Sequence, residues 1–334
     1  MTHTLHHTDA DVLVEDIDGD KKQITVKLRN ENTFMPIGTY ITAYPIELID
    51  KILSIKGPAW LCDEIMRDES SEYVEKHLEY DVFGYISKEA FRDKHVLDFG
   101  CGSGGSTMAL SRMLPNTRIT GVELESSLLE IAELRSNYYG VGDRVKLLLS
   151  PDGNSLPDDI GDFDFIFLNA VYEHLLPQER KTVLPLLWSH LKPKGILFIN
   201  QTPYRWFPIE NHTTSGLIFI NYMPDFIASF YARRFSKRKL ANNNWPTLLR
   251  KGIRGGSIRE IITILKNHSY SPILLTPSQL GLKDRIDMWY AVSSKSRYLI
   301  IKKSLFLIFK LIKISTGLIF LPSLSLAIEK PGDV

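Results

Sequence analysis

Between residues 95 and 200, short apolar runs alternate with segments of helical periodicity. Parallel strands cannot be joined by a tight turn and are usually connected by a helix. The alternation therefore predicts a parallel sheet with helices on both faces. The predicted strands are His95–Phe99, Arg118–Val122, Val145–Leu149, Phe163–Leu168 and Gly195–Asn200, and the predicted helices between them are Gly105–Met113, Ser126–Tyr138 and Gln178–Leu191.

The same pattern resumes in a later part of the chain. Ser257–Asn267 has helical periodicity, and Ser271–Leu275 and Ile286–Ser293 are apolar runs that we expect to be strands. With these two strands, the predicted fold is α/β, with a Rossmann-like sheet of seven mostly parallel strands.

Three further segments accompany this predicted core. Residues 1–34 are polar and acidic, so we expect a flexible tail with one short strand at Gln23–Leu28. Apolar residues at helical spacing predict a helical N-terminal extension over residues 35–90. Residues 204–256 are aromatic and basic, and since they follow the fifth strand we expect a cap at the ligand-binding edge of the sheet. The remaining predicted parts are a cofactor-binding core at 91–203, the rest of that core at 257–297 and an amphipathic tail at 298–334.

The composition excludes several classes of protein. The 334 residues include 40 basic and 39 acidic side chains, so no strong positive field would recruit nucleic acid. Two cysteines are too few for a disulfide framework or a cysteine-based zinc site. The acidic N-terminal segment contains no apolar stretch typical of a secretory signal, so we expect a cytoplasmic protein.

The stretch Val96–Thr107 carries the strongest functional signal. A predicted strand places Asp98 before a glycine-rich loop, and a predicted helix follows. Glycines permit positive φ and let a ligand approach the backbone closely. The loop fits the dinucleotide fingerprint G-x-G-x-x-G and also the D-x-G-x-G-x-G pattern of S-adenosylmethionine sites. Asp98 favours the second interpretation, because a carboxylate repels a pyrophosphate but binds an ammonium group.

Two more acidic residues follow predicted strands. Glu123 ends the second strand, where its carboxylate can accept hydrogen bonds from both hydroxyls of a ribose. Asp152 follows the third strand in the sequence Asp152-Gly153-Asn154, where a carboxylate can meet an adenine amino group. The alternative for Asp152 is an ordinary turn, which Asp-Gly favours in any protein.

Together these motifs resemble those of class I S-adenosylmethionine-dependent methyltransferases, most closely the quinone-biosynthesis and small-molecule O-methyltransferases. The similar stretches are Val96–Thr107, Gly121–Glu125, Asp152 and Phe163–Leu175. One departure is Ser150-Pro151 ahead of Asp152, where a glycine is usual. The resemblance implies S-adenosyl-L-methionine as the cofactor, held by Asp98, Gly100, Cys101, Gly102, Gly104, Thr107, Glu123, Leu124, Asp152, Gly153, Asn169, Ala170 and His174.

Methyl transfer to a hydroxyl is helped by a proton acceptor, and histidine has a suitable pKa. His174 follows the fourth predicted strand, where the resemblance also gives Glu-His a role in lining the donor pocket, so both roles remain open. His212 opens the predicted cap, and Glu210 could orient it; the alternative is a hydrogen-bonded loop histidine. We find no histidine and carboxylate spacing that builds a metal site, so no metal is expected.

The segment Tyr298–Ile328 is rich in aliphatic residues but is interrupted by lysines, so it lacks the continuous apolar length of a membrane-spanning helix. On a helical projection Lys302, Lys303, Lys310 and Lys313 gather on one side. We expect an amphipathic helix peripheral to an anionic membrane, on its inner face. The alternative is a terminal helix packed on the cap, with its lysines reaching water.

The sequence thus predicts a methyltransferase acting on a hydroxyl of a small or lipid-linked acceptor, such as a quinone or a glycan intermediate. One alternative is a nicotinamide-dependent oxidoreductase, and another is a non-catalytic scaffold protein that keeps the cofactor pocket. No nucleic acid partner is expected, because Asn169-Ala-Val-Tyr172 stands where base methylation uses Asn-Pro-Pro-aromatic.

Overall fold

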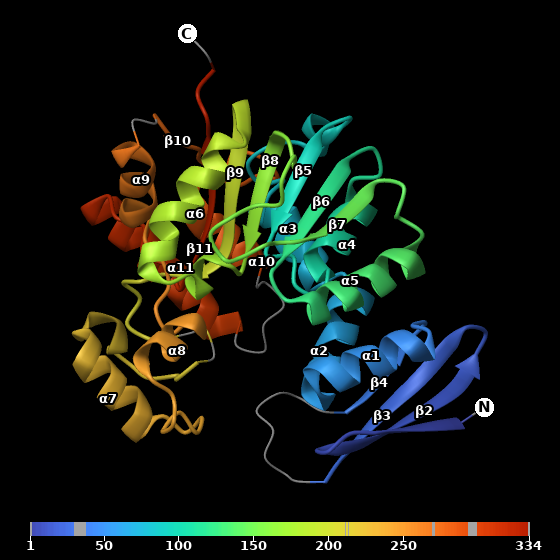
Figure 1. The fold of residues 1–334 in the computed structure, drawn as a ribbon. Coiled ribbons are helices and arrows are strands. Elements are labelled where there is room, and N and C mark those ends of the chain that lie inside the picture. The colour runs from blue at the N-terminus through green and yellow to red at the C-terminus, as the bar shows by residue number, and fades with distance from the viewer. Residues whose placement is uncertain are drawn as a thin grey trace. The chain divides into compact units, whose positions relative to one another are not determined.

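The structure is a computed structural model that describes residues 2–29, 38–210, 212, 214–268, 271–292 and 299–332. By its contacts the chain divides into two compact units. The first unit comprises residues 1–78 and 101–149, and the second comprises residues 79–100 and 150–334. Figure 1 labels the helices and strands of both.

Seven strands form one mostly parallel sheet in the order β10-β11-β9-β8-β5-β6-β7. Strand β8 is parallel to both β5 and β9, and β6 is parallel to β7. Strand β11 is antiparallel to both β9 and β10 (Figure 1). The predicted Rossmann-like α/β fold is therefore confirmed. The strands are β5 (His95–Phe99), β6 (Arg118–Glu123), β7 (Val145–Leu149), β8 (Phe163–Asn169), β9 (Leu191–Pro203), β10 (Ile273–Leu274) and β11 (Ser323–Glu329).

The helices that connect these strands lie where the alternating pattern predicts them. They are α4 (Gly105–Met113), α5 (Ser126–Tyr139), α6 (Pro177–Ser189) and α9 (Ile258–Asn267), with short 3-10 helices η1 (Lys88–Phe91) and η2 (Tyr172–His174). Buried aromatic rings fill the core of the second unit around β8 and β9. Phe167 stacks on Phe198 with ring centroids 4.8 Å apart, and Phe91 contacts Phe165 at 4.1 Å. Such burial on both faces is typical of a central parallel strand.

Two predictions about the late part of the chain are wrong. The predicted closing strand Ile286–Ser293 is the helix α10 (Arg285–Val292), because Asp284 Oδ1 accepts hydrogen bonds from the backbone N–H groups of Ile286 and Asp287 at 2.9 and 3.0 Å. An aspartate in this position starts a helix. The strand that completes the sheet is instead β11, in the segment predicted as a tail. Its Leu324, Leu326 and Ile328 are buried. Ser293 and Tyr298, which end and begin predicted segments, lie outside the described residues.

The prediction of a flexible tail at residues 1–34 is also wrong for the described residues. They contribute three of four strands in an antiparallel sheet of order β1-β2-β3-β4. Alternate residues Ala10, Val12 and Val14 are buried, and the many acidic residues of this segment made it appear unstructured in sequence. The strands are β1 (Thr2–His6), β2 (Ala10–Asp18), β3 (Lys21–Leu28), which contains the predicted Gln23–Leu28, and β4 (Thr39–Thr42). The predicted helical extension follows as α1 (Ile46–Lys56), α2 (Pro58–Glu69) and α3 (Val74–Asp81).

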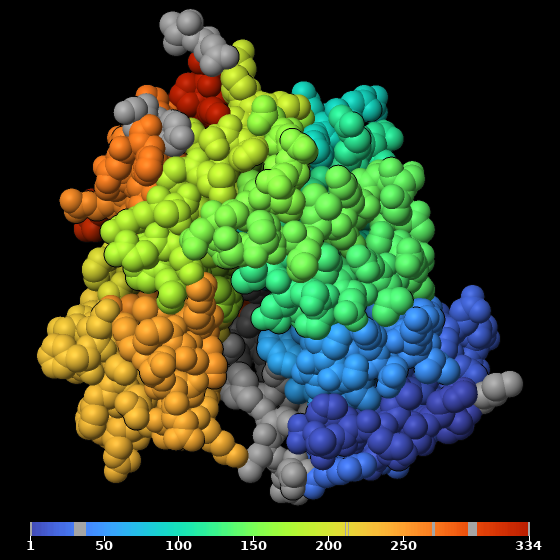
Figure 2. Space-filling view, viewed as in Figure 1, coloured from blue at the N-terminus to red at the C-terminus, as the bar shows by residue number. Residues whose placement is uncertain are grey.

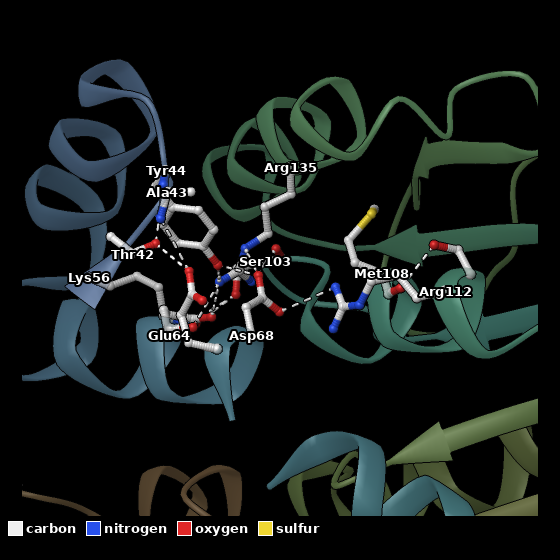
Figure 3. A network of polar contacts seen from close by, with 12 residues as sticks. Thr42, Ala43, Tyr44, Lys56, Glu64, Asp68, Ser103, Met108, Arg112 and Arg135 are labelled. Atoms are coloured by element: carbon white, nitrogen blue, oxygen red, sulfur yellow. Dashed lines mark hydrogen bonds and ion pairs between the residues drawn. The ribbon is translucent and has the colours of Figure 1, made fainter. Parts of the chain in front are cut away.

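A buried ionic network holds the helices of the first unit to the glycine-rich loop (Figure 3). Arg135 of α5 is fully buried and lies 2.7 Å from Glu64 Oε2 and 3.4 Å from Asp68 Oδ2, both on α2. The same guanidinium donates to the carbonyl oxygen of Ser103 at 2.9 Å. Lys56 of α1 pairs with Glu64 and donates to Ser103 Oγ at 3.2 Å. Burial alone would raise the pKa of the Glu64 carboxyl. The charges of Arg135 and Lys56 lower this pKa by more than burial raises it, so the carboxyl is ionised.

The cap lies within the second unit and has a small hydrophobic core of its own. Its elements are η3 (Ile220–Tyr222), α7 (Asp225–Phe235) and α8 (Trp245–Arg250). Figure 2 shows the cap as a lobe at the surface, coloured yellow to orange. Its buried residues are Ile220, Ala228, Ala232, Leu240, Leu248 and Ile253.

The predicted orientation of the lysines in the C-terminal helix is wrong. On α11 (Leu299–Thr316), Lys310 lies 2.9 Å from Asp284 Oδ2, and Lys313 lies 2.6 Å from the same atom. Lys302 is buried and donates to the carbonyl oxygen of Tyr290 at 2.6 Å. These lysines therefore face the protein, and Asp284 supplies the partner that the sequence did not reveal. Among the helices of the described ranges, none has the length and apolarity needed to cross a bilayer.

We predict that Glu64→Gln lowers the free energy of unfolding by about 3–5 kcal/mol, because it leaves the buried Arg135 charge without its main partner. Urea unfolding at pH 7 measures the change. The control is Glu75→Gln, which removes the partly exposed partner of Arg112 and should cost about 1 kcal/mol or less. Equal losses in the two variants would show that the buried network contributes no more than a surface pair.

Candidate functional site

The glycine-rich loop between β5 and α4 needs glycine at specific positions. Gly100, Gly102 and Gly104 have φ values of 71°, 57° and 84°. A side-chain carbon at Gly100 would lie 2.8 Å from Val171 Cγ2, and one at Gly104 would lie 3.0 Å from Ala132 Cβ. Gly104 is also the residue before the first turn of α4. The loop is thus a tight backbone turn that ends at a helix N-terminus, where N–H groups are left without helical partners.

Asp98 occupies the end of β5 and is fully buried. Asn169, at the end of the neighbouring strand β8, donates from Nδ2 to Asp98 Oδ1 at 3.2 Å. Asn200 on β9 donates to Asn169 Oδ1 at 3.0 Å. The structure therefore brings together two residues that the sequence analysis named separately, at the carboxyl ends of adjacent parallel strands. Ala170, the next residue, has a positive φ of 54°.

Glu123, at the end of β6, holds the backbone of the loop. Its Oε2 accepts from the N–H of Gly102 at 2.7 Å, and its Oε1 accepts from the N–H groups of Leu124 and Glu125 at 2.7 and 3.0 Å. The Leu124 side chain is exposed. Cys101 is buried, with its N–H bonded to the carbonyl of Val122 at 3.0 Å, and Thr107 is buried in the first turn of α4.

Asp152 and Gly153 form a turn, as one of the two sequence interpretations expects. Asp152 Oδ1 accepts from the N–H of Asn154 at 2.7 Å. This hydrogen bond, with further ones from Ser155, lowers the pKa of the exposed Asp152 carboxyl. Thr182 on α6 donates to Asn154 Oδ1 at 3.0 Å, so the turn is tied to the second unit's own helix.

The two predicted catalytic histidines meet, although they are far apart in sequence. The rings of His174 and His212 lie edge to face with centroids 4.8 Å apart. Nδ1 of His174 lies 2.6 Å from the carbonyl oxygen of Arg250, and Nδ1 of His212 lies 3.0 Å from that of Lys251. Both rings are thus fixed by the backbone at the C-terminal end of α8.

The carboxylate beside the His212 ring is Glu173, which the sequence analysis missed. Glu173 is fully buried, and its Oε1 lies 3.3 Å from His212 Nε2. Burial lowers the pKa of His212, but Glu173 raises it more, so the pKa lies above the ordinary value. The predicted partner Glu210 instead accepts from the backbone N–H of His212 at 2.7 Å and from three donors on Ser215 and Gly216. Glu210 therefore shapes the loop and Glu173 contacts the ring.

Gly252 makes room for the His212 ring. A side-chain carbon at Gly252 would lie 2.4 Å from His212 Nδ1, and φ at this residue is +77°. The position therefore excludes other residues for two reasons, a clash and a strained backbone. No pattern in the sequence connects Gly252 with His212, because the contact depends on how the cap folds back.

The segment that contains the glycine-rich loop is similar to known proteins. Residues 96–195 match a family described as "Methyltransferase domain". This segment of the chain is thus similar to methyltransferase domains, in agreement with the predicted S-adenosylmethionine-dependent family and cofactor. The dinucleotide interpretation of the glycine loop is set aside by this match.

Three relatives with similar sequences match between 31% and 39% of the chain. An uncharacterized protein of Synechococcus sp. is 38% identical over 106 residues, which is 31% of this chain and 24% of that protein. A carboxy-S-adenosyl-L-methionine synthase of Actinobacillus succinogenes is 27% identical over 38% of this chain and 50% of its own. A ubiquinone biosynthesis O-methyltransferase of Colwellia psychrerythraea is 24% identical over 39% of this chain and 50% of its own. The match therefore spans half or less of the length of each of these relatives.

Proposed function

We propose that the protein transfers the methyl group of S-adenosylmethionine to a hydroxyl oxygen of a small or lipid-linked acceptor. The observation that carries this proposal is the buried Asp98 at the end of β5, followed by the glycine turn that opens α4 within the methyltransferase segment. Asn169 supplies one hydrogen bond to the buried Asp98 carboxylate, and a cationic partner can add a charge-assisted one. The ammonium group of the donor is such a partner.

Other residues near the glycine-rich loop and at the ends of neighbouring strands are proposed to contact the rest of the donor. A carboxylate offers about four acceptor positions, and three on Glu123 are filled, so Glu123 Oε2 retains one for a ribose hydroxyl. In this proposal Asp152 and Gly153 meet the adenine. The remaining proposed contacts are Gly100, Cys101, Gly102, Gly104, Thr107, Leu124, Asn169, Ala170 and His174.

Methyl transfer from a sulfonium is an in-line displacement, so the protein must align acceptor oxygen, methyl carbon and sulfur. We propose that the acceptor hydroxyl binds beside the rings of His174 and His212. These rings lie together and are fixed by backbone carbonyls. His212, paired with Glu173, would accept the hydroxyl proton. Glu210 supports this role by holding the backbone of His212.

The cap offers a surface for a larger acceptor. Phe226, Phe230 and Trp245 line an open groove together with Arg233 and Arg234. Aromatic rings beside two guanidinium groups suit an acceptor that combines an apolar part with a phosphate. Two other arginines of the cap are already paired, Arg250 with Glu179 and Arg254 with Asp225. S-adenosylhomocysteine formation from the lipid fraction of a cell extract, but not from the water-soluble fraction, would support a lipid-linked acceptor over a small polar one.

Asp98→Asn is predicted to weaken S-adenosylmethionine binding about tenfold to hundredfold, because it removes a charge-assisted bond worth about 1.5–3 kcal/mol. Isothermal titration calorimetry measures the affinity. The control is Asp158→Asn, an exposed position outside the proposed donor contacts, which should leave the affinity unchanged. Equal affinity of Asp98→Asn and the unaltered protein would contradict the proposed ammonium contact, and nicotinamide nucleotides in the same titration test the oxidoreductase alternative.

Gly252→Ala should reduce turnover about tenfold to hundredfold with donor affinity unchanged, because the added carbon displaces His212. The control is Gly281→Ala, where φ is +73° but no atom lies within 4 Å of the added carbon. Both variants place a side chain at a residue with positive φ, but only Gly252→Ala places a carbon against His212. S-adenosylhomocysteine formation at saturating donor measures turnover. Similar rates in the two variants would remove His212 from the mechanism, and no product with any acceptor would favour a non-catalytic scaffold.

We also propose that α11 rests on a membrane surface through its aliphatic face. Ile300, Leu307, Leu311 and Ile314 recur at three- and four-residue spacing and are at least 59% exposed. This spacing places them along one side of the helix. Because Lys302, Lys310 and Lys313 contact the protein, we expect apolar burial rather than attraction to anionic headgroups to drive binding.

Liposome sedimentation should show binding to neutral phosphatidylcholine that persists in about 0.5 M salt, because apolar contacts are not screened. Replacing Leu307, Leu311 and Ile314 with serine should leave the protein in the supernatant. Lys303→Gln, on the same helix but exposed, is the control and should still bind. Binding that requires anionic lipid and disappears in salt would support the electrostatic mode expected from the sequence instead.

A further inference from the structure

Three side chains from two distant segments converge in the second unit. Glu173 and His174 lie in η2, and His212 lies at the start of the cap. Each offers one atom able to bind a metal ion, and these atoms all lie within 4.8 Å of one another. Two imidazoles with one carboxylate form a ligand set that protein zinc sites use.

Each of the three side chains is oriented by a hydrogen bond from its other polar atom. The carbonyl oxygens of Arg250 and Lys251 can only accept, so Nδ1 of each histidine donates and leaves Nε2 for another partner. Glu173 Oε2 accepts from Thr202 Oγ1 at 3.1 Å. Metal-binding histidines and carboxylates are held in this manner by partners outside the metal shell.

The remaining carboxylate oxygen is buried, and no donor among the described residues forms a hydrogen bond to it. Glu173 Oε1 lies 3.3 Å from His212 Nε2 but not in hydrogen-bond geometry. Two ligands that are each about 2.0–2.1 Å from a tetrahedral ion lie about 3.3 Å apart. The distance between these two atoms therefore fits neighbouring ligands of one ion.

We propose that Glu173, His174 and His212 bind one divalent transition-metal ion such as Zn²⁺. Imidazole ligands favour Zn²⁺ and similar ions over Mg²⁺ and Ca²⁺, which prefer oxygen. Three protein ligands leave a fourth position open, as in catalytic zinc sites. An acceptor hydroxyl bound there would lose its proton to water more easily, and His212 would then act as a ligand instead of as the proton acceptor. This use of the metal rests on the proposed function, whereas metal binding itself does not.

The sequence analysis expected no metal because His212 is separated from Glu173 and His174 by the whole of α6 and β9. Ligand spacing within one helix or hairpin is recognisable in a sequence, but a site closed by a cap is not. The competing account of the same contacts is an ion pair between Glu173 and protonated His212 with no metal. Direct metal binding distinguishes the two.

The experiment titrates the full-length protein with Co²⁺ and then Zn²⁺ and records the visible absorption of bound Co²⁺. We expect one equivalent of Co²⁺ to bind with the intense absorption of low coordination, and Zn²⁺ to displace it. Glu173→Gln, His174→Gln and His212→Gln should each weaken binding by about tenfold to hundredfold or more. Circular dichroism and urea unfolding establish that each variant is folded.

Two controls isolate the cluster. His190→Gln alters a histidine whose Nδ1 also lies 2.9 Å from a backbone carbonyl, that of Gly161, but which lies outside the cluster. Replacement of His3, His6 and His7 by alanine removes the N-terminal histidines. Both controls should keep the Co²⁺ absorption. Its absence from the unaltered protein, its persistence in the three cluster variants, or its loss in either control would overturn the proposal.

Calorimetry with S-adenosylmethionine separates this result from the proposed function. Donor binding without metal binding would overturn the metal site alone. Metal binding without methyl transfer would support the site and count against the proposed reaction. If Glu173→Gln or His212→Gln fails to fold, His174→Gln decides, because that side chain is less buried than Glu173.

Discussion

The guanidinium of Arg135 is the contact on which the first unit most depends. It is fully buried between Glu64 and Asp68, and it donates to the Ser103 carbonyl in the loop that is proposed to hold the donor (Figure 3). Removing any one partner leaves a charge in a medium that cannot solvate it. The N-terminal helices therefore contribute directly to the proposed site, because their carboxylates hold Arg135, which fixes the backbone of the glycine-rich loop.

The alternation of apolar runs and helices was sufficient to predict the parallel part of the sheet. The central strands β5 and β8 are buried on both faces, and such strands have continuous apolar runs that can be recognised in a sequence. The antiparallel elements were harder to predict. Ala10, Val12 and Val14 are buried at every second position of an acidic segment, and β11 follows an aliphatic helix whose composition it shares. Asp284, which starts α10, turned an expected strand into a helix.

The residues of the candidate site also differ in whether the sequence could predict them. Asp98, the loop glycines and Glu123 could be predicted because a strand, a turn and a helix follow one another within a short stretch. Glu173 could not, since its partner His212 reaches it only after the cap has folded. Gly252 was equally hidden, because the space it leaves for the His212 ring belongs to tertiary packing. Local motifs reveal the donor side, while acceptor chemistry depends on contacts between distant segments.

Strand β11 has a consequence for how the protein is made. It lies between β9 and β10, and β10 pairs within the described sheet only through it. During synthesis β9 leaves the ribosome long before Ser323–Glu329. Its edge therefore stays unpaired until the whole cap and α11 have been synthesised. An unpaired strand edge is a template for association with other chains. Nascent chains that pause before residue 323 would therefore rely on chaperones more than the finished protein does.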